Sequence, residues 1–247
     1  MGGDRHSMKL IHGDCLKHLR EIPDNSVDLV LTSPPYNMNL RISNGKHISR
    51  QLVKEISTKY DGFDDNLPMD EYFNFNRKVL VELLRVSPLV FYNVQFLTGN
   101  KKALYDLIGH FSHKLKEFIV WDKGHGQPAI SEGVLNSQWE AILVFENDNA
   151  ISRRFETAQF DRGTLSNLWR ITRGESHPDH GATFPMELAK KIVGSFSSKG
   201  DTVLDPFMGT GTTGAACRAL DREFIGIELL ENYYTYACDR LHTETLL

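Results

Sequence analysis

The sequence lacks the features that mark membrane and secreted proteins. No apolar run in its 247 residues approaches the ~20 residues that a membrane-spanning helix needs. Residues 1–7 are polar and have no apolar core of the kind found in signal peptides, so we treat them as a tail. The three cysteines, Cys15, Cys217 and Cys238, form no CxxC pair. These absences favour a protein of the reducing cytoplasm, without a membrane anchor.

Metal-binding patterns, internal repeats and low-complexity segments are lacking as well. The histidine pairs His110/His113 and His177/His180 have neither a nearby cysteine nor a third ligand, so we expect no metal site. The net charge is −4, which does not by itself indicate a nucleic-acid-binding protein. The length, with 40% hydrophobic and 24% charged residues, fits one large globular domain.

Apolar strands and helices alternate along the chain. Strands are expected at 10–12, 27–32, 89–92, 118–121, 141–145, 202–205 and 223–227. Helices are expected to follow the first strand and near 70–84, 103–108, 185–196, after 211 and from about 232. This alternation predicts a single α/β domain over 8–247, with a doubly wound, mostly parallel sheet covered on both faces. Two polar stretches, about 37–66 and about 146–182, interrupt the pattern.

A glycine-rich turn is the clearest ligand-binding element: Asp205-Pro206-Phe207-Met208-Gly209-Thr210-Gly211-Thr212-Thr213. Its glycines allow positive φ angles and close approach of a ligand, and the following helix offers free N–H groups. Glu228 follows the next strand, where it is either a solvated acid or an acceptor for both ribose hydroxyls of a nucleoside. The third glycine of the dinucleotide fingerprint is missing and no lysine supports a P-loop, so S-adenosylmethionine is favoured over NAD.

A second motif, Thr32-Ser33-Pro34-Pro35-Tyr36, ends another buried strand. Its prolines lack N–H donors, which is expected to leave neighbouring carbonyl groups free to accept from a ligand. Ser33 adds an acceptor oxygen and Tyr36 an aromatic face, so the motif suits a planar base with an NH2 group. Hydrogen bonds to both amino protons favour a pyramidal nitrogen whose lone pair can attack a methyl group. A Pro-Pro turn with a packing tyrosine is the alternative.

In this order the two motifs resemble those of the DNA amino-methyltransferases, specifically the permuted class often called β. There a Ser-Pro-Pro-Tyr motif precedes a Phe-x-Gly-x-Gly motif, as at Ser33–Tyr36 and Phe207–Gly211 here. Further matches lie at Gly13-Asp14, Trp121-Asp122-Lys123, Trp139-Glu140-Ala141-Ile142-Leu143, His180-Gly181-Ala182-Thr183-Phe184-Pro185 and Gly226-Ile227-Glu228. The resemblance implies a Rossmann-like methyltransferase sheet with circularly permuted motifs, S-adenosylmethionine as cofactor, and methylation of the exocyclic amino group of a base flipped out of double-stranded DNA.

The resemblance also implies roles for individual residues. The catalytic set is Ser33, Pro34, Pro35 and Tyr36. The cofactor-binding set is Asp14, Thr32, His180, Asp205, Phe207, Gly209, Thr210, Gly211, Thr212 and Glu228, with Asp14 near the adenine. The family fold places the strand ending at Asp205 beside the strand ending at Thr32, so that methyl donor and base meet across one crevice.

Basic residues cluster in the two polar stretches, where they form either solvated surface or DNA contacts. The loop at about 37–66 carries Arg41, Lys46 and Arg50; the expected target-recognition region at about 146–182 carries Arg153, Arg154, Arg170 and Arg173. Such side chains contact phosphates or read guanine edges. The region is short, so recognition would need either a short site or a second subunit, as in a homodimer. A cognate restriction endonuclease is a further candidate partner.

The sequence leaves the target base between cytosine N4 and adenine N6. Ser33 at the first motif position and the spacing His180-x-x-x-Phe184-Pro185 resemble cytosine enzymes, whereas Asn37 is familiar from adenine enzymes. Cytosine N4 is favoured. Methylation of RNA or of a protein glutamine remains an alternative, although those enzymes usually carry Asn-Pro-Pro-Tyr after the glycine motif. A dehydrogenase and a catalytically silent DNA-binding module are the remaining alternatives.

Overall fold

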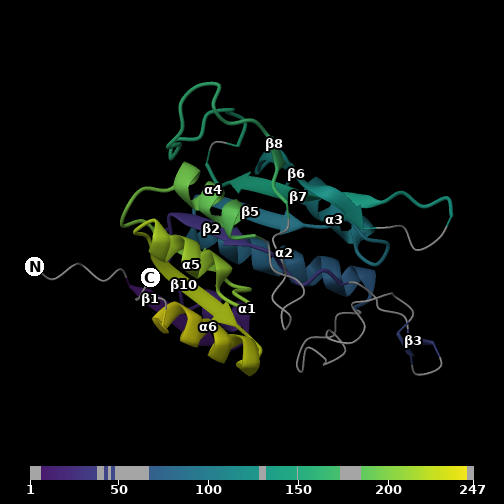
Figure 1. Ribbon diagram of the computed structural model, residues 1–247, viewed down its shortest axis with the longest axis horizontal. Coiled ribbons are helices and arrows are strands. Elements are labelled where there is room, and N and C mark those ends of the chain that lie inside the picture. Colours follow the sequence, from purple (N-terminus) through teal and green to yellow (C-terminus); the bar gives the residue numbers. More distant parts are fainter. Residues whose placement is uncertain are drawn as a thin grey trace, which may run out of the picture.

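The computed structural model describes residues 7–37, 42–43, 46–47, 67–127, 132–148, 150–172 and 185–243. Its centre is an eight-stranded sheet with the order β1-β10-β9-β2-β5-β7-β6-β8 (Figure 1). These strands are β1 (Met8–His12), β2 (Leu29–Thr32), β5 (Leu89–Val94), β6 (Leu115–Gln127), β7 (Ser137–Glu146), β8 (Leu168–Arg170), β9 (Thr202–Asp205) and β10 (Glu223–Glu228). The helices are α1 (Cys15–Leu19), α2 (Met69–Val86), α3 (Lys101–His110), α4 (Met186–Phe196), α5 (Thr212–Ala219) and α6 (Glu231–Thr243).

The sheet is mostly parallel, as the alternating sequence pattern predicts. β1, β10, β9, β2 and β5 are successive parallel neighbours, and β6 is parallel to β8. β7 is antiparallel to both β5 and β6, so within the described sheet it is the one reversed strand. The predicted α/β class and doubly wound, mostly parallel sheet are therefore confirmed.

Helices cover both faces of the sheet (Figure 1), and successive strand residues feed two separate cores. On β2, Val30 packs with α1, α2 and α3, whereas Leu29 and Leu31 pack with α4, α5 and α6. Because both faces are buried, the central strands are continuous apolar runs rather than alternating ones. Within the described residues, none of the helices is both long enough and apolar enough to cross a membrane.

Three short strands lie in stretches where the sequence predicts no regular structure. β8 extends the sheet beside β6, and its central residue Trp169 is 1% exposed between two exposed neighbours. A strand this short shows too little periodicity to be recognised from the sequence. In the first polar stretch, the two-residue strands β3 (Ile42–Ser43) and β4 (Lys46–His47) pair antiparallel.

Candidate active site

The two sequence motifs lie next to each other at the carboxyl end of the sheet. β2 and β9 are parallel neighbours, with Val30 opposite Leu204. At the ends of these strands, Thr32 Oγ1 donates a hydrogen bond to Asp205 Oδ1 at 2.7 Å. The predicted juxtaposition of the two strand ends is therefore confirmed. From β9 the chain continues to β10 on one side, and from β2 it continues to β5 on the other side. Open α/β sheets bind ligands at such switch points.

Asp205 links the first motif to the glycine-rich turn and to α5. It is 2% exposed. Its Oδ1 also accepts from the backbone N–H of Phe207 at 3.1 Å, and its Oδ2 accepts from Thr213 Oγ1 at 2.7 Å. Burial raises the pKa of this carboxyl to about 6, although hydrogen bonds from Thr213, Thr32 and Phe207 oppose the shift. One carboxylate therefore holds three segments of the candidate site together.

The glycine-rich turn has the backbone geometry that its sequence predicts. Gly209 has φ 53° and Gly211 has φ 80°, both in the left-handed region that glycine adopts without strain. A Cβ at Gly209 would meet no atom within 4 Å, so its surroundings are open. At Gly211, the N-cap of α5, a Cβ would come within 3.1 Å of Leu241 Cδ1. The turn is thus open at its first glycine and packed at its second.

Glu228, the last residue of β10, faces this turn. Its Oε2 accepts from Gly209 N at 2.8 Å and its Oε1 from Leu230 N at 2.9 Å. The side chain is buried, and burial raises the pKa of its carboxyl. A carboxylate has about four lone-pair sites. The two backbone bonds therefore fix the orientation of Glu228 while leaving acceptor capacity for ligand hydroxyls.

The remaining expected cofactor residues surround the same turn. Gly13 N donates to the backbone oxygen of Glu228 at 2.9 Å, which brings Asp14 to this edge. Asp14 itself caps α1 by accepting from Lys17 N at 2.8 Å. The other members are Phe207, which packs on Phe75, and the buried Thr210 and Thr212 beside Arg240. His180 lies outside the described residues.

The backbone of the Pro-Pro-Tyr corner is held by neighbouring side chains. Tyr72 Oη donates to the carbonyl of Pro35 at 2.7 Å, and Asn100 Nδ2 donates to the carbonyl of Tyr36 at 2.6 Å. The expectation that the prolines leave neighbouring carbonyls free is therefore wrong for these two groups. Prolines remove local N–H donors, but side chains from α2 and from the start of α3 supply others.

The Tyr36 hydroxyl lies in a polar network of four side chains. It receives hydrogen bonds from Ser33 Oγ at 2.9 Å and from Asn93 Nδ2 at 2.8 Å, and it donates to Glu140 Oε2 at 2.9 Å. Asn93 Nδ2 also donates to Glu140 Oε2 at 2.9 Å. The other carboxylate oxygen, Oε1, pairs with Lys123 Nζ at 3.3 Å. The side chains of Lys123 and Glu140 are 4% and 1% exposed, so this is a buried ion pair.

Sequence reasoning assigned no role to Asn93, Lys123 or Glu140. Lys123 and Glu140 lie in segments that match the family, but the match does not say what they contact. The clearest signal was at Asn93, which interrupts the otherwise apolar strand β5. Lys123 in β6 and Glu140 in β7 have other polar residues near them in their strands and stand out less. Buried charges are nearly always paired, so a lysine and a glutamate in neighbouring buried strands indicate a contact.

The predicted DNA-contacting residues are only partly described. Arg153 and Arg154 are exposed in the segment before β8, and Arg154 Nε lies 3.6 Å from Glu156. Arg170, in β8, is 75% exposed and pairs with Asp122 at 2.8 Å. Hydrogen bonds from Gln138, Gly124 and Arg170 lower the pKa of Asp122 to about 2. Arg41, Arg50, Arg173 and the side chain of Lys46 lie outside the described residues.

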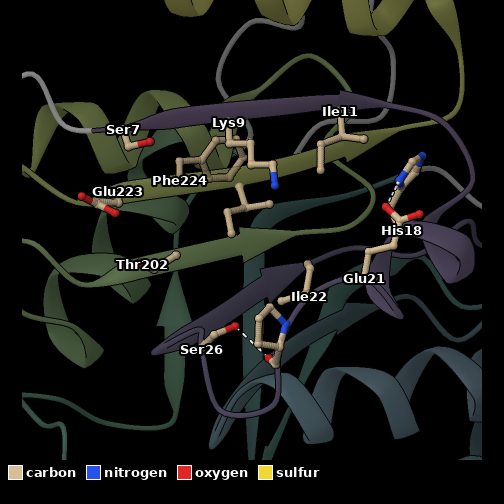
Figure 2. A pocket seen from close by; sticks show the side chains of 12 residues that line it. Ser7, Lys9, Ile11, His18, Glu21, Ile22, Ser26, Thr202, Glu223 and Phe224 are labelled. Carbon is tan, nitrogen blue, oxygen red and sulfur yellow. Dashed lines mark hydrogen bonds and ion pairs between the residues drawn. The ribbon is translucent and has the colours of Figure 1, made fainter.

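A pocket of about 260 Å³ lies away from these motifs, among residues of β1, α1 and the first residues of β9 and β10 (Figure 2). Figure 2 shows His18 hydrogen-bonded to Glu21 at its rim, with Nδ1 2.9 Å from Oε2. Two of its lining residues, Thr202 and Glu223, are the first residues of β9 and β10, whose last residues are Asp205 and Glu228. The pocket therefore lies toward the amino ends of these strands and is not part of the candidate active site.

Comparison with solved structures supports the fold. The PvuII DNA methyltransferase, described as cytosine-N4-specific, superposes with a TM-score of 0.72 at 17% identity, covering 98% of this chain and 88% of that one. TTHA0409 from Thermus thermophilus, solved with S-adenosyl-L-methionine, gives 0.65 at 25% identity, covering 96% of this chain and 94% of that one. Both share the α/β methyltransferase architecture described above.

Sequence comparison identifies the family. The type II methyltransferase M.HinfI of Haemophilus influenzae is 28% identical over 253 residues, which cover 94% of this chain and 67% of that protein. The type II methyltransferase M2.DpnII of Streptococcus pneumoniae is 26% identical over 256 residues, covering 98% and 92%. The family model described as DNA methylase matches residues 27–239. The chain, with its Ser-Pro-Pro-Tyr and glycine-rich motifs joined through Thr32 and Asp205, belongs to the DNA methylase family.

Proposed function

We propose that this protein transfers the methyl group of S-adenosylmethionine to the N4 amino group of cytosine in double-stranded DNA. The observation that carries the proposal is the hydrogen bond between Thr32 and Asp205. It joins the strand that leads to Ser33 and Tyr36 with the strand that leads to the glycine-rich turn. A base at the first corner and a nucleoside cofactor at the second would therefore lie across one switch point of the sheet.

The residues at the second corner fit an adenosine-bearing cofactor. Gly209 leaves open space beside the turn, and the buried carboxylate of Glu228 keeps acceptor capacity for ribose hydroxyls. The relative from Thermus thermophilus binds S-adenosyl-L-methionine in its crystal structure. When bound, S-adenosylmethionine would supply an electrophilic methyl group on a sulfonium; the C–S bond breaks with its electron pair staying on sulfur, and the new C–N bond forms from the lone pair of the amine.

The first corner fits the acceptor side of that reaction. An aromatic amine is a poor nucleophile because its lone pair is delocalised into the ring. Acceptors placed at its amino protons favour the pyramidal nitrogen found in the transition state. Ser33 Oγ supplies one such acceptor, and the ring of Tyr36 supplies a stacking face worth roughly 1–3 kcal/mol. After transfer, the extra proton on the methylated nitrogen is released to solvent.

The preference for cytosine rests on Ser33 at the first motif position. The sequence argument for adenine was Asn37, which follows the tyrosine. Asn37 is 1% exposed, and its side chain bonds backbone groups on both sides: Nδ2 donates to Leu67 O and Gly99 O, and Oδ1 accepts from Leu67 N. These bonds give Asn37 a structural task that is independent of the base, which weakens the case for adenine.

Incubation of the protein with duplex DNA and S-adenosylmethionine labelled in the methyl group tests the proposal. Digestion of the DNA to nucleosides, followed by mass spectrometry, should show N4-methylcytosine. N6-methyladenine in its place would retain the DNA methyltransferase and refute the choice of base. Label in RNA or protein, with none in DNA, would refute the substrate class. Sequencing of the modified DNA would then give the recognition site.

A further inference from the structure

We infer that Glu140, held by Lys123, is a positioning residue that sets the direction of the hydrogen bonds through Tyr36 and so makes Ser33 Oγ an acceptor toward the target amino group. The inference deepens the proposed function and rests on it. Its basis is the run of contacts from Lys123 to Glu140, Tyr36 and Ser33, with distances of 3.3, 2.9 and 2.9 Å.

Each hydroxyl among these contacts has one proton to donate, so the group at the end, Glu140, decides the direction of every hydrogen bond between it and Ser33. An ionised carboxylate is an acceptor only. Tyr36 must therefore donate its proton to Glu140 Oε2, because the opposite arrangement would place two lone pairs against each other at 2.9 Å. With its proton committed there, Tyr36 can only accept from Ser33. Ser33 then donates inward, and the lone pairs of its oxygen are left to receive a proton of the base amine.

Asn93 agrees with this order. Its Nδ2 donates both to Tyr36 Oη and to Glu140 Oε2, which requires both to be acceptors on that side. The same orientation leaves Asn93 Oδ1 buried without a hydrogen-bond partner among the described residues. A buried acceptor without a partner is unfavourable, because it has given up its hydrogen bonds to water. The amide keeps this orientation despite that cost, as expected if Glu140 presents an acceptor and not a donor.

The reverse order would weaken Ser33 as an acceptor for the base amine. If Tyr36 donated to Ser33 Oγ, one serine lone pair would be occupied, and the serine proton would have to go to the carbonyl of Asn93 at 3.4 Å or toward the base. A proton facing the base amine repels it. The direction set by the negative charge at Glu140 therefore leaves both serine lone pairs for the base, whereas the reverse direction leaves at most one.

The variant Glu140→Gln should reverse the network while preserving its shape. Lys123 would hold the amide oxygen of the new side chain, which turns the amide NH2 toward Tyr36. The tyrosine proton then has no acceptor at position 140 and can be donated to Ser33. We expect kcat for methyl transfer to fall about 10- to 100-fold, as when one preorganised polar group is lost from an active site. The affinity for S-adenosylmethionine and the KM for DNA should stay near wild-type values.

A double-mutant cycle with Tyr36→Phe shows whether Glu140 acts through the tyrosine. Phenylalanine keeps the ring but removes the link, so Ser33 can donate to the Asn93 carbonyl whatever residue stands at 140. Tyr36→Phe should therefore lose less activity than Glu140→Gln. Adding Glu140→Gln to it should change kcat by no more than about twofold, since the effects are coupled. Multiplication of the two effects would show that Glu140 acts without Tyr36 and would overturn the inference.

Removing the lysine from the Glu140→Gln protein gives a test that a merely structural role would not pass. In the double variant Glu140→Gln, Lys123→Met, the lysine no longer holds the amide oxygen away from Tyr36, so the amide can turn and accept again. Part of the lost kcat should return, although two polar groups have been removed. No recovery in a folded double variant would overturn the role given to Lys123.

The matched control is Glu146→Gln, at the other end of the same strand. Glu146 is 9% exposed and pairs with Lys116. Its loss removes a comparable buried carboxylate and should leave kcat unchanged. If the wild type methylates DNA and the Glu140→Gln variant does so at the same rate, the inference is overturned but the proposed function stands. No transfer to DNA by the wild type would overturn the proposed function, and the inference with it.

Discussion

The residues that organise this site are polar side chains whose partners come from another strand. Asp205 accepts from Thr32 across the β2–β9 pair, and Tyr36 donates to Glu140 on β7. In both cases a buried carboxylate is an acceptor for hydroxyl groups of a sequence motif. In a low-dielectric interior no water competes for these hydrogen bonds. They therefore hold the side chains in place better than solvent-exposed hydrogen bonds do. Two predictions belong to this scale.

Replacing Asp205 with asparagine should remove a pH dependence of stability. Burial raises the pKa of Asp205 from its ordinary value of 3.8 to about 6, so the folded state binds this proton more tightly than the unfolded state does. This contribution to stability is present below pH 3.8 and is lost as the pH rises through 6. The loss amounts to roughly 3 kcal/mol in the wild type.

Urea denaturation of both proteins at several pH values checks this prediction. The free energy of unfolding of the wild type, relative to Asp205→Asn, should fall between pH 4 and pH 7. A constant offset from the lost hydrogen bonds to Thr32 and Thr213 is expected and does not affect the slope. Two parallel profiles would mean that the Asp205 carboxyl titrates alike in the folded and unfolded states.

The variant Tyr36→Ala should abolish methyl transfer while cofactor binding survives. It removes the stacking face, worth roughly 1–3 kcal/mol, and the hydroxyl that orders Ser33. The cofactor corner should be unaffected, because its contacts run through Asp205, Gly209 and Glu228. Labelled-methyl transfer and calorimetric titration with S-adenosylmethionine measure the two effects separately. Loss of cofactor affinity would show that the two corners do not divide the work in this way.

At the scale of elements, the turn between β9 and α5 combines ligand access with tight packing. Its two glycines share a left-handed backbone but differ in surroundings, since Gly209 is open and Gly211 faces α6. β8 has a different task. It holds Arg170 at the sheet edge beside Asp122, which anchors the arginine-bearing segment 150–172 to the fold. The salt bridge is exposed, so we assign it little stability of its own.

Alanine at each glycine of the turn should separate binding from stability. Either change costs about 1–2 kcal/mol because a Cβ disfavours the left-handed region. Gly211→Ala should cost more, since its methyl group would lie 3.1 Å from Leu241 Cδ1 and 3.3 Å from Ala237 Cβ. Gly209→Ala should mainly weaken S-adenosylmethionine binding, because its methyl group points into open space beside the turn.

Chemical denaturation and calorimetric titration of both glycine variants measure the difference. The contrary result would be a Gly209→Ala protein with full cofactor affinity and a stability as low as that of Gly211→Ala. It would mean that the open space beside Gly209 is not used by the cofactor, and the site assigned to the turn would have to be moved.

For the whole molecule, the topology brings together motifs from opposite ends of the chain. The strand leading to Ser33 is an early one, and the strand leading to the glycine-rich turn comes late in the sequence. They are neighbours because β9 pairs with both β10 and β2 at the centre of the sheet. If a base flipped out of a duplex is held at this edge, as proposed, the basic residues of the polar stretch that follows Tyr36 are expected to contact phosphates.

The double variant Arg41→Ala, Arg50→Ala should weaken DNA binding and flatten its salt dependence. If each arginine contacts one phosphate, the slope of log K against log salt concentration falls in magnitude by about 2. Lys199→Ala is the control, because Lys199 is exposed, pairs with Asp221 and lies just before β9 at the amino end of that strand. Fluorescence anisotropy over a salt series measures both. An unchanged slope in the double variant would mean that these arginines are solvated surface residues that do not contact DNA phosphates.

Much of the fold was predictable because it depends on local pattern. Strand and helix periodicity located the strands of the sheet except β8, and the glycine spacing located the turn. The reversed direction of β7 was not predictable, because an apolar strand looks the same in either direction. Nor could the sequence show that Pro35 and Tyr36 carbonyls receive side-chain donors, since those donors come from α2 and from the start of α3.

The sequence by itself determined the two motifs, their order and the layered α/β class, because each of these rests on residue type and short-range spacing. Tertiary structure alone decided which polar groups surround Tyr36. Asn93 and Glu140 lie 57 and 104 positions from it along the chain. Periodicity tells which face of a strand a side chain occupies, but which strand lies beside it is set by packing of the whole sheet. The proton order at Ser33 depends on that packing.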